Sequence, residues 1–381
     1  MDEISITAST TANQPALAGF RGTQFIAVWE DFSDGSIRGQ MLSTAGKPAG
    51  DSFLVNVPGQ PGTKRRLPAI VETGGGFVVA WNEQAAGTAP GGGAQLKLRT
   101  FDADTLSGAE IQVSSAEVEP LIRPALARLS DGGFVVAWAD KRADERIRAQ
   151  RFGFEGEKAG PEFRANTIAG LHRVPMVASL TNDALAIGWR ARLQPALSLH
   201  LQLFDAEGPG GEQATGIEIT EAAMTALDSG RFVVVHVRSA GDSEPGFETT
   251  VAHASVFEAG GAFSGRRFAA TAGRILSSWP TVVALSGGRF VLAWTEVNVD
   301  APGAGTNVMA RLFSETQGAI GKPVQVNTST GHQRFSLSAA ATAGPDGETL
   351  FAAWNDDSPT VGTNPAHALR GRPLPIPAGG F

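Results

Sequence analysis

A short apolar phrase that ends in tryptophan recurs along the whole chain. It reads "GGGFVVAWNE" at 74–83 and returns as "DGGFVVAWAD" at 131–140 and "SGGRFVLAWTE" at 286–296. Aligned on the tryptophan, seven copies lie 47 to 60 residues apart, with His236 replacing the tryptophan in the fifth. Repetition at this period predicts an array of similar supersecondary units.

Each copy contains the patterns of four short strands. A proline opens a first, small-residue strand, a glycine turn leads into the Trp strand, and two further strands follow. The opening residues are Pro15, Pro68, Pro124, Pro175 and Pro280, with Ala222 in the fifth copy. Seven such units predict an all-β chain, and within this class a single seven-bladed β-propeller domain over 1–381 with four antiparallel strands per blade.

The ends of the chain fit together in this scheme. The seventh copy lacks its fourth strand, whereas residues 3–8 at the N-terminus match that strand's pattern. These residues are predicted to complete the last blade and close the ring, which removes exposed sheet edges; an open solenoid is the alternative. The predicted blades span about 14–57, 67–115, 123–167, 174–220, 222–271, 279–328 and 334–375 plus 3–8.

Composition excludes several classes of function. The chain has no cysteine, so it has no disulfide and no thiolate metal site or thiol nucleophile. A net charge of −7 argues against nucleic-acid binding, which uses a basic surface. No apolar run is long enough for a membrane span. We expect a monomer with no nucleic-acid partner.

The phrase "P-x-ϕ-A-x-L-x-D/S-G-G-F-V-V-A-W", followed by "I-R-A-Q-R-F-x-x-x-G", resembles the propeller repeats of large bacterial secreted proteins of the haemolysin-type calcium-binding class. The resemblance covers the chain about 50 residues at a time. It implies an extracellular or cell-surface protein, exported without an N-terminal signal, but no particular activity. The glycine- and aspartate-rich nonapeptides that bind calcium in that class are absent.

Charged residues follow the repeat as well. The residue two past the tryptophan is acidic in five blades: Asp31, Glu83, Asp140, Glu296 and Asp356. The next strand carries Arg38, Lys97, Arg148, His200, His253, Met309 and Arg370 at one shared position. We interpret these as structural acid–base pairs across the hairpin, not as catalytic carboxylates. The repeated tryptophans are expected to pack between blades.

The connections between blades carry the candidate binding residues. In a propeller these connections share one face, around the mouth of the channel, where clustered positive charge attracts anions. Trp279 stands outside the repeat position and is a candidate platform for stacking a sugar. The predicted ligand-binding residues are Arg66, Arg123, His172, Arg173, Trp279, His332 and Arg334. Local pairing of each arginine with Glu117, Glu119 or a post-Trp acid is the alternative.

No catalytic or metal-binding motif stands out. The histidines have no zinc spacing and there is no Gly-x-Ser-x-Gly elbow. The segments 31–35 and 298–303 have spaced oxygen donors but no full ligand set, which leaves calcium possible but unsupported. No cofactor and no catalytic residue is therefore predicted.

Three functions remain open from the sequence. The first is a non-enzymatic, lectin-like propeller that recognises a glycan or another anionic extracellular ligand on its loop-bearing face, at one or a few unequal sites. The second is a structural propeller that binds a protein partner and no small molecule. The third is a polysaccharide lyase or hydrolase.

Overall fold

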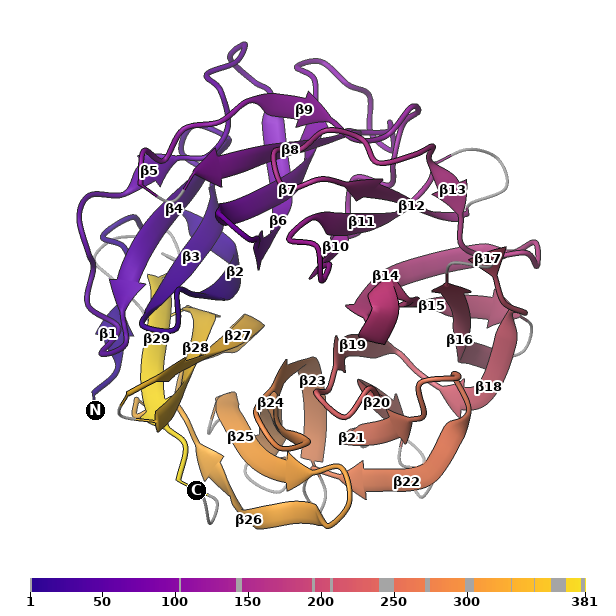
Figure 1. Ribbon diagram of the computed structural model, residues 1–381. Coiled ribbons are helices and arrows are strands. Elements are labelled where there is room, and N and C mark those ends of the chain that lie inside the picture. Colours follow the sequence, from indigo (N-terminus) through magenta and orange to yellow (C-terminus); the bar gives the residue numbers. More distant parts are fainter. Residues whose placement is uncertain are drawn as a thin grey trace. The chain divides into compact units, whose positions relative to one another are not determined.

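The computed structural model describes most of the chain and consists almost entirely of β-strands (Figure 1). One 3-10 turn, η1 (Thr181–Asp183), is the only helical element in the described ranges. The described residues are 2–102, 104–141, 146–193, 196–205, 208–239, 250–270, 275–298, 305–329, 331–345, 347–357, 368–377 and 381.

The first three blades are four-stranded antiparallel sheets in sequential order. Blade one contains β2 (Ala12–Phe20), β3 (Gln24–Asp31), β4 (Ser36–Ser43) and β5 (Phe53–Leu54). Blade two contains β6 (Lys64–Glu72), β7 (Gly76–Gln84), β8 (Gln95–Asp102) and β9 (Glu110–Gln112). Blade three contains β10 (Ala125–Arg128), β11 (Phe134–Ala139), β12 (Ile147–Phe152) and β13 (Phe163–Arg164).

The next three blades repeat this order with small variations. Blade four contains β14 (Leu171–Ser179), β15 (Leu185–Leu193), β16 (Ala196–Asp205), and the two edge strands β17 (Gly208–Pro209) and β18 (Gln213–Glu218). Blade five contains β19 (Glu221–Ala226), β20 (Phe232–Ser239), β21 (Thr250–Phe257) and β22 (Phe263–Ala269). Blade six contains β23 (Ile275–Ala284), β24 (Arg289–Asn298), β25 (Asn307–Ser314) and β26 (Gly318–Gln325). One parallel residue pair links blades five and six into a single sheet.

The seventh blade uses both ends of the chain. It contains β27 (Arg334–Gly344), β28 (Gly347–Asp356), β29 (Ala368–Pro375) and, as its fourth strand, β1 (Ile4–Ser5). Ile4 pairs with Gly371 and Ser5 with Arg370, antiparallel, and the Ile6 amide donates to the Leu369 carbonyl at 2.9 Å. The predicted seven-bladed β-propeller, with the N-terminal strand completing the last blade, is confirmed.

The chain divides into two compact units. One comprises Met1–Ala27, Gln40–Asp51 and Ile219–Phe381, and the other comprises Val28–Gly39 and Ser52–Glu218. The first unit therefore holds β1, β2 and blades five to seven, and the second holds blades two to four. Each is described by itself below.

The tryptophans pack between blades, as predicted. Trp138 lies in a cluster with Val78 and Ala80 of blade two, and Trp189 in a cluster with Val135 and Ala137 of blade three. In the first unit, Trp294 packs with blade five and Trp354 with blade six. All four are at most 2% exposed. Because the Trp strand is buried on both faces, its sequence is a continuous apolar run.

Most inner strands contain a β-bulge at their start. The register shifts between Arg66 and Ala69 in β6 and at the same place in β14, β23 and β27. One non-glycine residue in each bulge has a positive φ, which side chains rarely adopt. These residues are Leu67, Val174, Trp279 and Ser336, and Gln14 in β2 also has a positive φ.

No helix of the described chain is long and apolar enough to cross a membrane.

The β1 strand should contribute measurably to stability through Ile6, which is 3% exposed. We expect Ile6→Ala to lower the free energy of unfolding by about 2–5 kcal/mol, because it removes a buried side chain and leaves a cavity. Chemical denaturation followed by tryptophan fluorescence measures this loss. Ser5→Ala, on the exposed side of the same strand, is the control and should change stability far less.

Candidate functional site

A hollow of about 620 Å³ opens at the start of β6 in the second unit. Its wall includes Phe32, Asp34, Lys64 and Arg65, together with the proline- and glycine-rich segment 58–62. Phe32 follows the Trp strand of blade one and is 51% exposed. An exposed aromatic ring beside charged groups in a concave surface is a common feature of ligand sites.

Among the described residues, some charged side chains around this hollow have a partner of opposite charge, and one does not. The Arg65 guanidinium donates to the Glu83 carboxylate at 2.8 Å, and Arg38 donates to Asp34 at 2.8 Å. Lys64 is exposed and forms no hydrogen bond or ion pair within the described part of the chain. Its ammonium group is therefore available to an anionic ligand.

Two residues further along β6, Arg66 belongs to a cluster around the buried Glu30. The Glu30 carboxylate accepts the Leu67 amide at 2.5 Å. Burial raises the pKa of Glu30, while the positive charges of Arg123 and Arg66 lower it in part. Arg123 donates to the Pro68 carbonyl at 2.6 Å, and burial lowers the pKa of its guanidinium to about 10. Arg66 is half-buried, and its positive charge interacts with Glu30 without a direct side-chain hydrogen bond among the described residues.

A second cluster of the same kind lies where blades three and four begin. The Glu119 carboxylate is 3.4 Å from the Lys141 ammonium and 3.7 Å from the Arg173 guanidinium. The Asn82 amide, at the end of the blade-two Trp strand, donates to the Glu119 and Ile122 carbonyls. These contacts place the start of blade three next to the end of β7.

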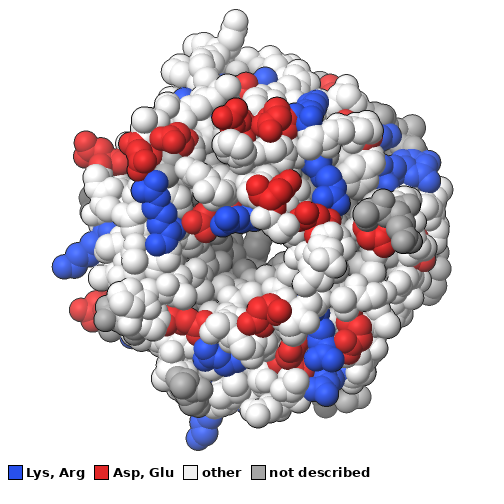
Figure 2. Space-filling model, in the orientation of Figure 1, with Lys and Arg blue, Asp and Glu red and all other residues white. Residues whose placement is uncertain are grey.

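Positive charge exceeds negative charge in both clusters. Glu30 is shared by Arg66 and Arg123, and Glu119 is shared by Lys141 and Arg173. Among the described residues, each cluster therefore brings two basic side chains to one carboxylate. Figure 2 shows basic and acidic side chains interleaved over the face that is in view. The excess is local, because the whole chain carries a net charge of −7.

The structure places three predicted residues in the first unit. Trp279 is 39% exposed and has a positive φ in the bulge of β23. Its backbone amide donates to the Glu221 carboxylate at 2.5 Å. His332 is half-buried at the start of blade seven. Arg334 is 2% exposed, its guanidinium is hydrogen-bonded to three neighbouring residues, and burial lowers its pKa.

The four predicted residues of the second unit differ from one another in their surroundings and in their exposure to solvent. Arg66 and Arg123 belong to the cluster around Glu30, and Arg173 belongs to the cluster around Glu119. His172 is 1% exposed, and its ring packs edge-on against Trp189. The ring Nε2 lies 2.9 Å from the Ile168 carbonyl, and burial lowers the pKa. His172 therefore lies inside blade four, away from solvent.

Trp279 shares its strand pair with an unusual carboxyl group. Glu296 pairs with Ser277 in the register of β23 and β24, two residues before Trp279. Burial raises the pKa of Glu296, and its carboxylate accepts the Trp294 indole N–H at 2.7 Å. The side chain is half-buried. Met309, at the position that is basic in other blades, pairs with Trp294 in the strand register, and the indole of Trp294 is the hydrogen-bond partner of Glu296.

The predicted acid–base pairs occur in some blades and take another form in others. Arg38 pairs with Asp31 at 3.3 Å and Arg148 with Asp140 at 2.5 Å, as predicted. In blades two and seven the acid pairs with an arginine of the inner strand: Glu83 with Arg65 and Asp356 with Arg334. The Arg in these blades precedes the bulge, where sequence spacing alone does not reveal which neighbour it faces.

Sequence analysis missed Phe32 and Lys64. Their signal was present, since only the first copy has an aromatic residue directly after the post-Trp acid, and Lys64 opens the "KRR" run. Only the fold shows that both line one hollow. Of the long loops, most of 239–250 and 297–307 and nearly all of 357–367 lie outside the described residues.

The buried histidine of blade five should make the fold sensitive to acid. Burial, together with the charges of His253, Arg267 and Arg238, lowers the pKa of His236 to about 3. The pKa in the unfolded chain is about 6.5, so this contribution to stability is present above that pH and is lost as the pH falls toward 3. We expect His236→Gln to flatten the decline of the unfolding midpoint between about pH 7 and pH 4.5.

Ser255→Ala is the control for this prediction, because it removes the hydroxyl 3.1 Å from the His236 ring without removing a titrating group. It should shift the midpoint similarly at each pH. An unchanged slope in His236→Gln would contradict the prediction.

Comparisons with known proteins agree on the fold. No protein-family model and no curated protein matches the chain. Three solved structures align with nearly all of it. A protein of unknown function from Dyadobacter fermentans is 13% identical with a TM-score of 0.55, covering 99% of this chain and 98% of its own. A polysaccharide lyase, the PL25 ulvan lyase bound to -[GlcA(1-4)Rha3S]-, is 9% identical with a TM-score of 0.56, covering 97% and 95%. An α-L-arabinanase from Penicillium chrysogenum, complexed with arabinobiose, is 10% identical with a TM-score of 0.50, covering 98% of each chain. At these identities, the likeness shows the propeller fold alone.

Proposed function

We propose that the protein is a secreted or surface-exposed propeller that binds an acidic polysaccharide through the hollow at the start of β6. The observation that carries the proposal is the wall of this hollow, to which the exposed Phe32 ring and the exposed Lys64 side chain both belong. A sugar ring can stack on the Phe32 ring while its carboxylate or sulfate meets Lys64. The two clusters of excess positive charge, which include Arg66 and Arg173, extend the attraction beyond the hollow.

The comparisons support a glycan as the ligand class. The ulvan lyase structure holds an oligosaccharide of GlcA and Rha3S, and the arabinanase structure holds arabinobiose. Both have the fold of this chain. The resemblance of the repeats to haemolysin-type secreted proteins fits an extracellular ligand, and the excess of positive charge favours an acidic one. A monomer suffices, because the hollow is formed within one unit.

Binding should depend on charge and be weakened by salt. We expect wild-type protein to bind polygalacturonate or dextran sulfate at low salt, to bind more weakly at moderate salt, and to ignore neutral dextran. Lys64→Gln with Arg66→Gln should weaken binding about tenfold or more, and Phe32→Ala should weaken it independently of salt. Isothermal titration calorimetry measures these affinities.

Arg128→Gln is the matched control, since Arg128 is an exposed residue at the opposite end of an inner strand, 3.6 Å from Glu72. It should leave affinity unchanged. If the wild type binds no acidic polysaccharide, or if the double variant binds as the wild type does, the proposal is wrong. The protein-interaction scaffold is then the better interpretation.

A second candidate function is cleavage of a polysaccharide in the first unit. The observation that favours it is Glu296, a half-buried carboxyl group whose raised pKa suits a general acid, two residues across from the exposed Trp279. Trp279 would hold a sugar ring, and in a hydrolysis Glu296 would give its proton to the leaving oxygen while a water molecule adds to the anomeric carbon and releases its own proton to the solvent.

Cleavage would be seen as new reducing ends, or as unsaturated sugars absorbing in the ultraviolet, when the protein is incubated with acidic and arabinose-containing polysaccharides. We expect Glu296→Gln to abolish turnover, because the amide cannot donate a proton as an acid. Glu258→Gln, an exposed glutamate paired with Arg231 on blade five, should retain it. Absence of products across these substrates would reject the enzyme and leave the binding proposal intact.

A further inference from the structure

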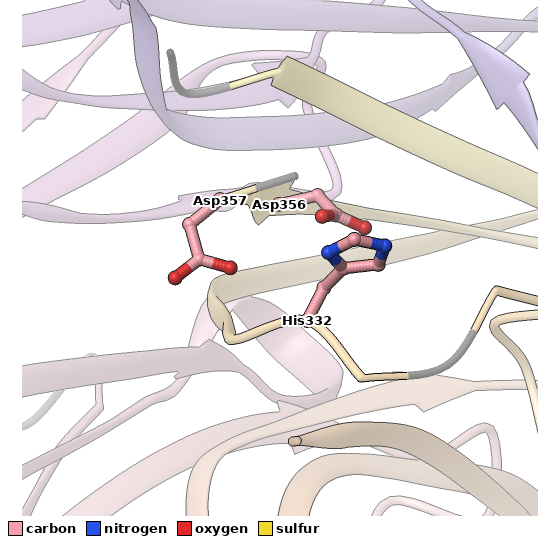
Figure 3. Close-up of side chains that lie close together, drawn as sticks. All are labelled: His332, Asp356 and Asp357. Carbon is pink, nitrogen blue, oxygen red and sulfur yellow. The ribbon is translucent and has the colours of Figure 1, made fainter. Parts of the chain in front are cut away.

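One imidazole and two carboxylates meet at the start of blade seven. His332 lies just before β27, Asp356 is the last residue of β28, and Asp357 follows it. Figure 3 shows the three side chains gathered at this point. One ligand atom from each lies within 4.8 Å of the others. Zinc ligands lie about 2.0–2.2 Å from the ion, so the three atoms must move closer together to coordinate one ion.

The backbone around these residues is held firmly. The His332 carbonyl accepts the Thr306 amide at 2.9 Å. Gly305 approaches so closely, with φ +79°, that a Cβ there would lie 2.5 Å from the His332 oxygen. The Gln333 amide donates to the Asp357 carboxylate at 2.6 Å, and the Asp357 amide donates to the Gln333 carbonyl at 3.1 Å. His332 and Asp357 are therefore positioned by main-chain contacts on both sides.

Blade two provides a reference within the same chain. Its Arg65–Glu83 pair occupies the place of Arg334 and Asp356, as the strand registers show. At the places of His332 and Asp357, blade two has Thr63 and Gln84, neither of which is a strong metal ligand. The ion pair thus belongs to the repeat.

His332 and Asp357 are additions made only in blade seven. No other copy has an acidic residue three past the tryptophan position. Two potential metal ligands therefore occur together at one point of blade seven, where the repeat itself does not require them. This favours a binding site specific to this blade.

Arg334 does not satisfy both carboxylates. Its guanidinium is already hydrogen-bonded to the carbonyls of Thr306, His332 and Ser329. Its Nε lies 3.4 Å from the Asp356 carboxylate, which is long for a charged hydrogen bond. Of the two carboxylates, Asp356 forms the ion pair with Arg334, whereas Asp357 accepts the Gln333 amide.

We propose that His332, Asp356 and Asp357 bind one divalent transition-metal ion, Zn²⁺ or Mn²⁺. An imidazole nitrogen with two carboxylate oxygens is a donor set that suits these ions. Calcium and magnesium prefer oxygen ligands throughout. The sequence analysis predicted no metal site, because the three ligands come from two segments 24 residues apart without a recognisable spacing. The site is independent of the proposed polysaccharide binding.

The test is titration of chelator-treated full-length protein with ZnCl₂, MnCl₂ and CaCl₂ separately, by calorimetry and by thermal unfolding. We expect one equivalent of Zn²⁺ or Mn²⁺ to bind and to raise the unfolding temperature, with reversal by chelator. His332→Thr combined with Asp357→Gln installs the residues of blade two, so the fold should be preserved. We expect this variant to lose about tenfold or more in affinity.

Asp51→Asn, which changes an exposed aspartate in blade one, is the control and should bind as the wild type does. If circular dichroism shows that the double variant is misfolded, Asp357→Asn replaces it, because the amide oxygen can still accept the Gln333 N–H. The proposal is overturned if the wild type binds neither metal, or if folded variants of His332 or Asp357 bind with wild-type affinity.

Discussion

Burial of the Trp strand on both faces is the constraint on which the remaining structure depends. Phe77 to Asn82 are buried without a break, and the same holds for Phe134 to Ala139 in blade three. A strand with no exposed face must be apolar along its length, and it must end in polar residues that have assigned partners. Those end residues connect one blade to the next.

The connection is a hydrogen bond from one blade to the start of the next. Glu30 accepts the Leu67 amide, and Asn355 accepts the Gln14 amide at 3.0 Å. Both donors are residues of an inner strand with a positive φ. The unfavourable backbone of such a residue is offset by a hydrogen bond to a buried acceptor. Trp279 has the same geometry with Glu221 as its acceptor, and this geometry leaves its ring partly exposed.

Function is expected where individual blades depart from this scheme. The repeat supplies an acid after the tryptophan and a basic residue to pair with it, which gives a neutral, structural pair. Blade one adds Phe32, blade two adds Lys64 and Arg66, and blade seven adds His332 and Asp357. The two proposed sites use these added residues: Phe32 and Lys64 in the second unit, and His332 and Asp357 at the start of blade seven.

The sequence by itself determined the fold class, because the repeated Trp phrase and the Ile4–Thr7 pattern require seven four-stranded units with the first strand in the last blade. It also identified which connections carry charge. Only the tertiary structure decided which of those charges are compensated: His172 and Arg334 are buried, Arg66 shares Glu30 with Arg123, and Glu83 pairs with Arg65 and not with Lys97. The reason is physical. Periodicity specifies which face of a strand is buried, whereas the pairing of charges at strand ends depends on bulges and on residues brought together from distant parts of the chain.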